Sequence, residues 1–145
     1  MENATILRAS ETETMSADWG SLTWHAGRTL GNSVDMTVGI AVIMAGCENP
    51  LHSHPNCSEV LVVMQGRIAH VIEGGKEVEM GKGDAITLPA TLPHKARNIG
   101  DEDAVTLVHV VGELRIGHHD AGRGCRPLLG HDGHRRSRFE KHRGA

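Results

Sequence analysis

From residue 36 to residue 112 the chain alternates hydrophobic and polar positions in short segments that end at glycine, proline or charged residues. Aliphatic and β-branched residues with a period of two are typical of half-buried strands. No segment of this region has the spacing of an amphipathic helix. The predicted strands cover residues 36–44, 59–65, 67–73, 76–80, 84–89, 94–99 and 104–112. The pattern therefore predicts an all-β domain, mainly antiparallel, of the sandwich or barrel kind.

Turn residues and the ends of the chain set the expected domain limits. Gly74 and Gly75 separate two alternating segments, and a glycine pair in that position is a signal for a tight hairpin. Residues 1–18 and 118–145 show no periodicity, so we expect them to be arms that are disordered or folded against a partner. A chain of 145 residues suits one domain. We place that domain, a β-barrel, at residues 19–117.

Aromatic residues are scarce enough to limit both the core and the chemistry. The aromatic residues are Trp19, Trp24 and Phe139, and the chain has no tyrosine. The core is therefore expected to be aliphatic. Mechanisms that use a tyrosine as acid, nucleophile or radical are excluded for this sequence.

Targeting signals and cysteines bear on the compartment. The first twenty residues are polar and acidic, without the cationic start and apolar stretch of a secretory signal. The apolar runs are shorter than the roughly 18 residues that a membrane span needs. Cys47, Cys57 and Cys125 are odd in number and widely spaced, which favours reduced thiols over a disulfide framework. We therefore expect a cytoplasmic protein.

The charge is divided between an acidic body and a basic tail. Residues 115–145 hold eight Lys or Arg and three Asp or Glu, so they carry +5, and the preceding residues carry −8 to reach the net charge of −3. Three interpretations of the tail are open: contact with nucleic acid, a secondary metal-binding segment, or solvated disorder. Basic clusters without interleaved aromatics are weak indicators of nucleic-acid binding. We favour disorder or docking on the acidic body. The tail histidines are His118, His119, His131, His134 and His142.

Two histidines and a glutamate follow one another closely before the second predicted strand. Residues two apart on an extended chain point to the same face, with Cα atoms about 6.6 Å apart. His52 and His54 could therefore bind one ion from one wall. Pro50 and Pro55 argue against a helix here. Glu59 begins the strand that follows the loop and would lie at the mouth of a barrel.

A fourth candidate ligand comes from the stretch at residues 81–98. Pro89 and Pro93 bracket a rigid turn that places His94 on a further strand, on the same face as Ala96 and Asn98. Three imidazoles and one carboxylate suit one divalent transition metal ion such as Fe, Mn, Ni, Zn or Cu. Such a set leaves coordination positions for water, substrate or oxygen, which is typical of catalytic metal sites.

These two stretches resemble the two sequence motifs of the cupin superfamily, in particular small single-domain cupins of the conserved-barrel type. The first motif is matched at Gly46, His52, His54, Glu59 and Gly66, and the second at Gly83, Pro89, His94 and Asn98. Thr91 stands where the family usually has glycine, a departure that concerns the local turn. The resemblance implies an antiparallel β-barrel of jelly-roll type with an internal metal held by the four predicted ligands. It also implies a homodimer, since small cupins commonly form dimers.

Four further residues each have a structural and a functional interpretation. His70 shares a parity with Ile68 and Ile72, so we expect it to point into the barrel. There it is either a group that transfers a proton or contacts the substrate, or a histidine whose ring hydrogen-bonds a neighbouring backbone group. His109 has the same ambiguity on a strand that is apolar on both faces. Cys57 is either a thiolate that approaches the metal or a plain loop residue. Trp24 either lines the cavity or is simply packed.

The resemblance leaves the reaction open, because cupins include dioxygenases, decarboxylases, isomerases, lyases, storage proteins and sensors, and fold does not give function. The first hypothesis is a metal-dependent, dioxygenase-like oxidoreductase acting on a small organic substrate. The second is a non-oxidative lyase, isomerase or decarboxylase in which His70 is the catalytic residue that moves a proton. The third is a non-catalytic module that binds or senses a small ligand. Neither a membrane nor a nucleic acid is an expected partner.

Overall fold

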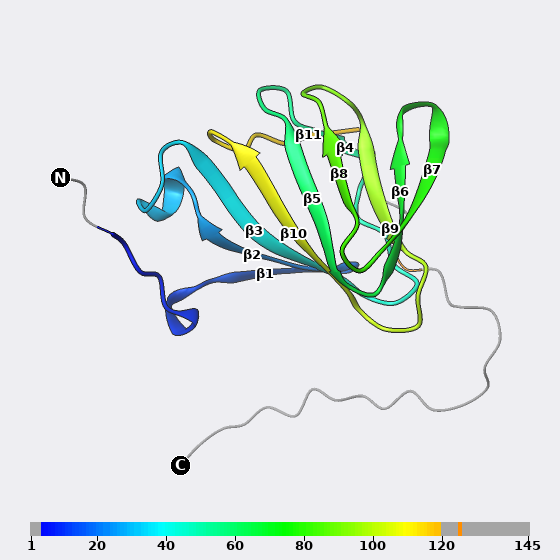
Figure 1. The fold of residues 1–145 in the computed structure, drawn as a ribbon, viewed down its shortest axis with the longest axis horizontal. Helices are drawn as coiled ribbons and strands as arrows, with labels where there is room; N and C mark the ends of the chain where they lie inside the picture. Colours follow the sequence, from blue (N-terminus) through cyan, green and yellow to red (C-terminus); the bar gives the residue numbers. More distant parts are fainter. Residues whose placement is uncertain (1–3, 120–124, 126–145) are drawn as a thin grey trace, which may run out of the picture.

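The computed structural model describes residues 4–119 and residue 125 (Figure 1). Three short 3-10 helices, η1 (Ala9–Glu11), η2 (Arg28–Leu30) and η3 (Glu73–Gly75), lie among the strands of this part of the chain. The strands are β1 (Thr14–Ala17), β2 (Gly20–Ala26), β3 (Met36–Ile43), β4 (His52–Ser53), β5 (Glu59–Gln65), β6 (Arg67–Ile72), β7 (Lys76–Gly81), β8 (Ala85–Leu88), β9 (His94–Asn98), β10 (Ala104–Val111) and β11 (Gly117–His118).

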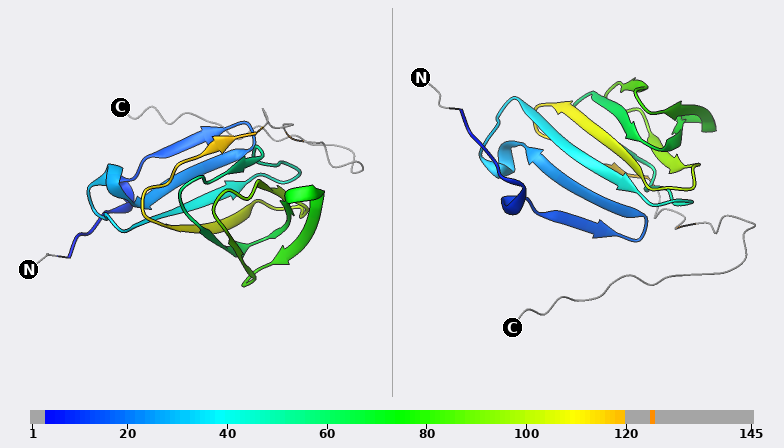
Figure 2. Two further views of the ribbon diagram at one scale, coloured as in Figure 1. Left: turned by 90° about the horizontal axis from the view of Figure 1, so that it is seen from above. Right: turned by 60° about the horizontal axis from the view of Figure 1, so that its bottom comes forward.

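The strands form two antiparallel sheets. The larger sheet has the order β1-β2-β3-β10-β5-β8, and the smaller has the order β11-β4-β9-β6-β7. Figure 2 shows, in the view from above, how the two sheets curve around a common interior. All the strand pairs described are antiparallel, which confirms the predicted all-β class.

The core lies between the inner faces of the two sheets. On β10, buried and half-buried residues alternate from Ala104 to Val110, as the period-two pattern predicts. Ile43, Val63 and Ile68 are almost wholly buried. These aliphatic side chains belong to one cluster against which Trp19 packs from the edge. The expectation of an aliphatic core is confirmed.

The turns on either side of β6 both contain glycine. Gly66, between β5 and β6, has a φ of 79° and would bring a Cβ within 3.0 Å of the Ala104 Cα, so a larger residue is strained there. The predicted hairpin between β6 and β7 is present, with Ile72 paired to Lys76. Its turn, Glu73–Gly75, is one residue longer than the two-residue turn that the glycine pair indicated.

Strands β1 and β2 lie before the region in which strands were predicted. All four residues of β1 are exposed and all seven of β2 are half-buried, so burial does not alternate along either strand. In the sequence of β2, however, Leu22, Trp24 and Ala26 do alternate with polar residues, and the prediction missed this signal. β1 lies within residues 1–18, which were expected to be an arm, and it pairs with β2 at the edge of the larger sheet.

The prediction that the cysteines are reduced thiols is wrong for two of the three. Cys47 and Cys125 form a disulfide between positions 78 residues apart. Cys57 is a free, buried thiol. The spacing did not indicate the pair because a disulfide depends on spatial approach, which sequence distance does not report. A disulfide is typical of oxidising compartments, so the cytoplasmic location gains no support from the thiols and stays a prediction.

The predictions about the tail and about assembly concern residues that the structure describes only in part. His118 and His119 are described, whereas His131, His134 and His142 lie outside the described residues. Among the described residues, no helix has the length and apolar character needed to cross a membrane. The homodimer stays a prediction.

Candidate metal centre

The four predicted ligands converge at one end of the barrel interior. His52, His54, Glu59 and His94 each offer one atom, and these atoms all lie within 4.8 Å of one another. Two ligands on opposite sides of an ion bound at about 2.2 Å lie about 4.4 Å apart, so the set has the size of a single-ion site. Three of the four residues are buried and the fourth, His52, is half-buried. The predicted convergence of these residues is confirmed.

Strand register brings these residues together. His52 in β4 and His94 in β9 are direct cross-strand partners in the smaller sheet. Glu59 begins β5 in the larger sheet, on the buried face that it shares with Leu61 and Val63, as predicted. His54 follows β4 directly, in the loop that leads to β5. The candidate site therefore draws ligands from both sheets, and binding an ion would link them.

Backbone carbonyls fix the three candidate imidazoles in one orientation. The Nδ1 atoms of His52, His54 and His94 lie 2.8, 2.9 and 2.8 Å from the carbonyl oxygens of Pro50, Arg115 and Leu92, respectively. A carbonyl only accepts hydrogen bonds, so each Nδ1 carries the proton. Each Nε2 is therefore the atom left to bind a metal, an arrangement typical of histidine ligands.

The His54–Glu59 pair carries a proton that a metal ion would displace. His54 Nε2 donates to Glu59 Oε2 at 2.6 Å, so this ring holds protons on both nitrogens. Burial acts to lower the pKa of His54, but the hydrogen bonds to Glu59 and to the Arg115 carbonyl raise it above 6.5. Burial likewise acts to raise the pKa of Glu59, and His54 and His94 outweigh it and lower that pKa to about 2. The carboxylate is therefore ionised near neutral pH and available to a cation.

An unpartnered nitrogen supports the fit to a metal ion. The buried His94 Nε2 has no hydrogen-bond partner among the described residues and lies 3.8 Å from Glu59 Oε2. A buried polar atom without a partner is costly unless a ligand satisfies it. Burial, followed by the proximity of His94, lowers the pKa of His52 to about 4, so its Nε2 also holds a free lone pair at neutral pH. The donor set is suited to a divalent transition metal.

A mainly apolar cavity adjoins the candidate ligands. Its volume is about 90 Å³. Its walls include Leu22, Trp24 and Leu61 from the larger sheet, and Leu114 and Ile116 from the segment after β10. A second cavity of about 220 Å³ shares Leu22, Trp24, Leu114 and Ile116 with the first. An organic molecule bound beside the ligands would therefore contact mostly hydrocarbon.

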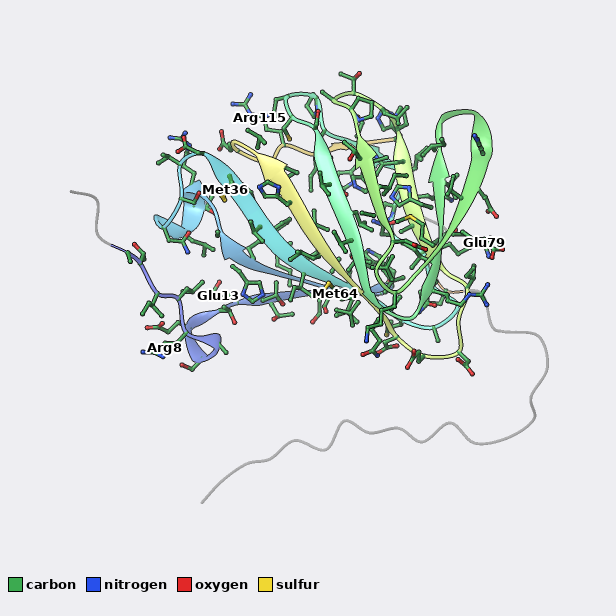
Figure 3. All side chains as sticks on the ribbon, viewed as in Figure 1. Arg8, Glu13, Met36, Met64, Glu79 and Arg115 are labelled. Carbon is green, nitrogen blue, oxygen red and sulfur yellow. A yellow bond between two sulfur atoms is a disulfide. The ribbon has the colours of Figure 1, made fainter. Side chains whose placement is uncertain are left out.

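The segment Glu113–His119, called the roof here, closes the candidate site at the mouth of the barrel. Its Arg115 carbonyl accepts the His54 hydrogen bond, and its Glu113 carbonyl accepts one from Asn56 at 2.6 Å. Figure 3 labels Arg115 at the upper end of the molecule, close to the loop before β5. The roof also forms β11, which pairs with β4, so His118 is the cross-strand partner of His52.

The sequence prediction assigned residues 118 and 119 of this roof to the tail and did not predict that the roof lines the cavity. His118, which was grouped with the tail histidines, lines the cavity with Leu114 and Ile116. These three residues share one parity, and their alternation with polar neighbours is a weak strand signal that could have revealed the roof. His119 contributes a hydrogen bond of 2.8 Å to Ser53 on β4.

His70 lies inside the barrel, as its parity predicted. Its ring is 1% exposed, lines the cavity and stacks on His94 with centroids 5.6 Å apart. Its Nδ1 has no hydrogen-bond partner among the described residues. Burial, followed by the proximity of His94, lowers the pKa of His70 to about 4. A neutral imidazole with an unpartnered nitrogen suits contact with a substrate, and its catalytic role stays a prediction.

The structure settles the position of the other three candidates. Cys57 is buried, and burial raises the pKa of its thiol, so it is neutral and outside the cluster of four ligands. Trp24 lines the cavity, which was the functional alternative for this residue. His109 is half-buried on the face of β10 opposite to Val108 and Val110, away from the cavity.

Thr91 adopts the conformation of the glycine that it replaces. Its φ is 72°, in the left-handed region that β-branched residues rarely occupy. Its N–H donates to the carbonyl oxygen of His54 at 2.8 Å. The departure from the family motif therefore leaves the turn intact and is expected to cost about 1–3 kcal/mol of backbone strain.

Comparison with known proteins agrees with the fold. A family model described as a cupin domain matches residues 39–111. A protein of Methanocaldococcus jannaschii without an assigned activity is 32% identical over 68 residues, which is 47% of this chain and 54% of that protein. A probable germin-like protein of Arabidopsis thaliana is 36% identical over 70 residues, 46% of this chain and 33% of that protein. The chain thus spans about half or less of these relatives.

Solved structures give the same fold. Lactobacillus farciminis oxalate decarboxylase, in its formate complex, superposes with a TM-score of 0.68 at 19% identity, over 75% of this chain and 34% of that one. The capsular polysaccharide assembling protein CapF of Staphylococcus aureus superposes with a TM-score of 0.61 at 21% identity, over 70% of this chain and 30% of that one. At these identities the likeness concerns the fold, which confirms the predicted jelly-roll type. With the domain match over half its length, this chain belongs to the cupin family.

Proposed function

We propose that this protein is a metal-dependent cupin enzyme that acts on a small organic substrate, with a dioxygenase-like oxidation as the favoured reaction. The observation that carries this proposal is the convergence of three imidazole Nε2 atoms and one carboxylate beside an apolar cavity. The proposed cofactor is one divalent transition metal ion: Fe, Mn, Ni, Zn or Cu. Such an ion polarises a bound substrate oxygen and brings the substrate and O₂ together.

The protein's own side chains have three proposed tasks. Backbone carbonyls hold the ligand rings in position, which sets the site before a substrate arrives. Leu61, Trp24 and Leu114 present hydrocarbon toward the reacting region and exclude water from it. His70, which lines the cavity and whose Nδ1 has no hydrogen-bond partner among the described residues, contacts the substrate.

A second candidate, a non-oxidative lyase, isomerase or decarboxylase, is favoured by the same His70. A neutral, buried imidazole at the cavity wall is suited to accept a proton from a substrate and return it. The proteins of similar fold include an oxalate decarboxylase, which supports decarboxylation as one of these candidate reactions. This reaction needs no oxygen and would run under anaerobic conditions, also with zinc.

Metal content tests the proposed centre first. The full chain, purified without an added polyhistidine tag, is expected to hold one transition metal ion per chain that resists dialysis. Glu59→Gln is expected to lower that content at least tenfold, because it removes the anionic ligand. The matched control is His109→Asn, which removes a histidine that lies away from the cluster. Equal metal loss in both variants, or retention in both, would refute the centre.

Oxygen uptake then separates the two reactions. The iron-loaded protein is assayed with a panel of enediols, catechols and keto acids, with and without oxygen. Consumption of O₂ coupled to substrate loss supports the oxidative reaction. Turnover without oxygen supports the non-oxidative one, and there His70→Gln is expected to reduce turnover while leaving the metal content intact. Ligand binding without any turnover would instead support a binding or sensing module.

A further inference from the structure

The cavity next to the candidate ligands has few polar side chains, and two of them are occupied by hydrogen bonds within the protein. Apart from the four ligands, the polar side chains in its lining are Asn49, His70, Thr106 and His118. Asn49 Oδ1 accepts a hydrogen bond from the Ala96 N–H at 2.7 Å, and the Thr106 hydroxyl donates to the Ala41 carbonyl at 3.3 Å. None of the described residues that line this cavity is a lysine or an arginine. Arg28 lines the second cavity, where its guanidinium donates a hydrogen bond to the Val34 carbonyl oxygen at 3.2 Å.

The charge of the site follows from the donor set. The three ligand imidazoles are neutral when Nδ1 holds a proton and Nε2 faces an ion. A carboxylate binds a metal ion in its deprotonated form, so Glu59 contributes one negative charge. With a divalent ion bound, the four ligands and the ion therefore sum to +1.

Charge balance then selects among chelating substrates. A dianion on the ion would leave a net charge of −1 inside an apolar cavity without a cationic side chain to compensate it. Burying an uncompensated charge is strongly unfavourable. A chelator that binds through two oxygens as a monoanion brings the sum to zero. The remaining part of such a molecule would lie against Trp24, Leu114 and Ile116, which line both cavities.

We infer that the site takes a monoanionic, two-oxygen chelator with an apolar body, such as an enolised dicarbonyl compound or a singly ionised hydroxyketone or catechol, and discriminates against small dicarboxylates. This inference rests on the proposed metal centre and narrows its substrate class. His70, which lines the cavity, is the residue that hydrogen-bonds the bound molecule.

Binding of two simple probes tests the inference without any turnover. The full chain is loaded with one Zn²⁺, which has no redox chemistry, and is titrated in a calorimeter with tropolone and with oxalate. Tropolone binds metals as an apolar monoanion and oxalate as a dianion. Tropolone is expected to bind at least tenfold more tightly than oxalate. Equal binding, or tighter binding of oxalate, by the zinc-loaded protein would overturn the inference.

A charge introduced into the wall provides the matched variant. Ile116 lines both cavities and is 42% exposed, so Ile116→Arg places a cation at the wall with little disturbance of the core. This change is expected to lower the ratio of tropolone affinity to oxalate affinity at least tenfold. Val111→Arg adds the same charge at a residue that is 69% exposed and lines neither cavity, and it should leave the ratio unchanged.

The outcomes separate this inference from the proposed function. A chain that fails to retain one zinc ion refutes the metal centre and the inference with it. A chain that retains zinc but shows no preference for tropolone refutes the inference alone and leaves the centre standing. An equal fall of the affinity ratio in Ile116→Arg and Val111→Arg would show that long-range charge, and not the cavity wall, sets the preference, which also overturns the inference.

Discussion

The substitution Gly39→Ala tests how closely the indole of Trp24 packs against the wall of the cavity. Gly39 on β3 and Trp24 on β2 are direct cross-strand partners. A Cβ at residue 39 would lie 2.3 Å from Trp24 Cε3 and 2.7 Å from Cζ3. Carbon atoms attract best at about 3.5–4.0 Å. The ring would therefore have to move by about 1 Å or more, toward the cavity or out of its packed position.

The expected cost is that of overpacking, about 1–3 kcal/mol of the free energy of unfolding. For a domain of this size, about 4 °C of melting temperature corresponds to 1 kcal/mol, so the melting temperature is expected to fall by about 4–12 °C. Urea unfolding followed by far-ultraviolet circular dichroism measures the effect. Tryptophan fluorescence is unsuitable as the only probe, because the substitution moves one of its two sources, Trp24.

A matched glycine provides the control. Gly81 ends β7, and a Cβ there would meet only Asp84 Oδ2, at 4.0 Å. Gly81→Ala is expected to leave stability unchanged or raise it by up to about 1 kcal/mol, since alanine restricts the unfolded chain. A loss of stability as large as that of Gly39→Ala would show that glycine is needed in these strands for some other reason.

A double-mutant cycle refutes or supports the cause itself. In a Trp24→Ala background the indole is gone, and the closest remaining neighbour of the new Cβ is the Thr23 carbonyl oxygen at 3.0 Å. That contact needs a shift of a few tenths of an ångström, so Gly39→Ala is expected to cost less than about 0.5 kcal/mol there. An equal cost in both backgrounds would mean that the backbone, and not Trp24, makes residue 39 intolerant of a side chain.

Three further predictions follow from single features. Burial holds the pKa values of His52 and His70 at about 4, below the 6.5 of the unfolded chain. Because the unfolded state binds more protons between these values, the metal-free protein should lose stability as pH falls from about 6.5 to about 4. Urea unfolding with a chelator present measures this, and a flat stability profile between pH 4 and 6.5 would contradict the lowered pKa values. His54, with its raised pKa, acts in the opposite sense above pH 6.5. Thr91→Gly should raise the free energy of unfolding by about 1 kcal/mol or more, since it relieves a φ of 72°, and a loss of stability would show that Thr91 is not strained. Cys125→Ser should lower the free energy of unfolding by about 2–4 kcal/mol under oxidising conditions. Under reducing conditions, urea unfolding should give the variant and the wild-type protein the same free energy of unfolding.

Features with a local signal could be predicted from the sequence. The strands from residue 36 onward follow from a period of two, and β3, predicted at residues 36–44, is found at Met36–Ile43. The inward position of His70 follows from its parity with Ile68. The four candidate ligands lie in two stretches of the chain, and it is the resemblance of both stretches to the cupin motifs that predicted their convergence. The strands and the position of His70, by contrast, follow from the geometry of neighbouring residues alone.

Features that depend on approach in space could not be predicted in this way. The Arg115 carbonyl meets His54 across 61 positions, and Cys47 meets Cys125 across 78. When two residues lie this far apart along the chain, neither one indicates in the sequence which residue it will contact. Strand β2 (Gly20–Ala26) is a different case, because its sequence alternates apolar Leu22, Trp24 and Ala26 with polar residues and could have been predicted. Two of these apolar residues, Leu22 and Trp24, line both cavities.

The roof and the proposed metal centre depend on each other through His54. Without a metal, this ring donates one hydrogen bond to Glu59 and one to the Arg115 carbonyl of the roof. A bound ion would take the place of the first proton, so the contact with the roof would become the remaining hydrogen bond of the ring and would hold it in the orientation that the ion requires. Linkage is reciprocal, so whatever keeps the roof closed, including an apolar substrate against Leu114 and Ile116, would also strengthen metal binding. Selection of the proposed substrate and retention of the proposed cofactor would in this way be two consequences of the same few contacts at the barrel mouth.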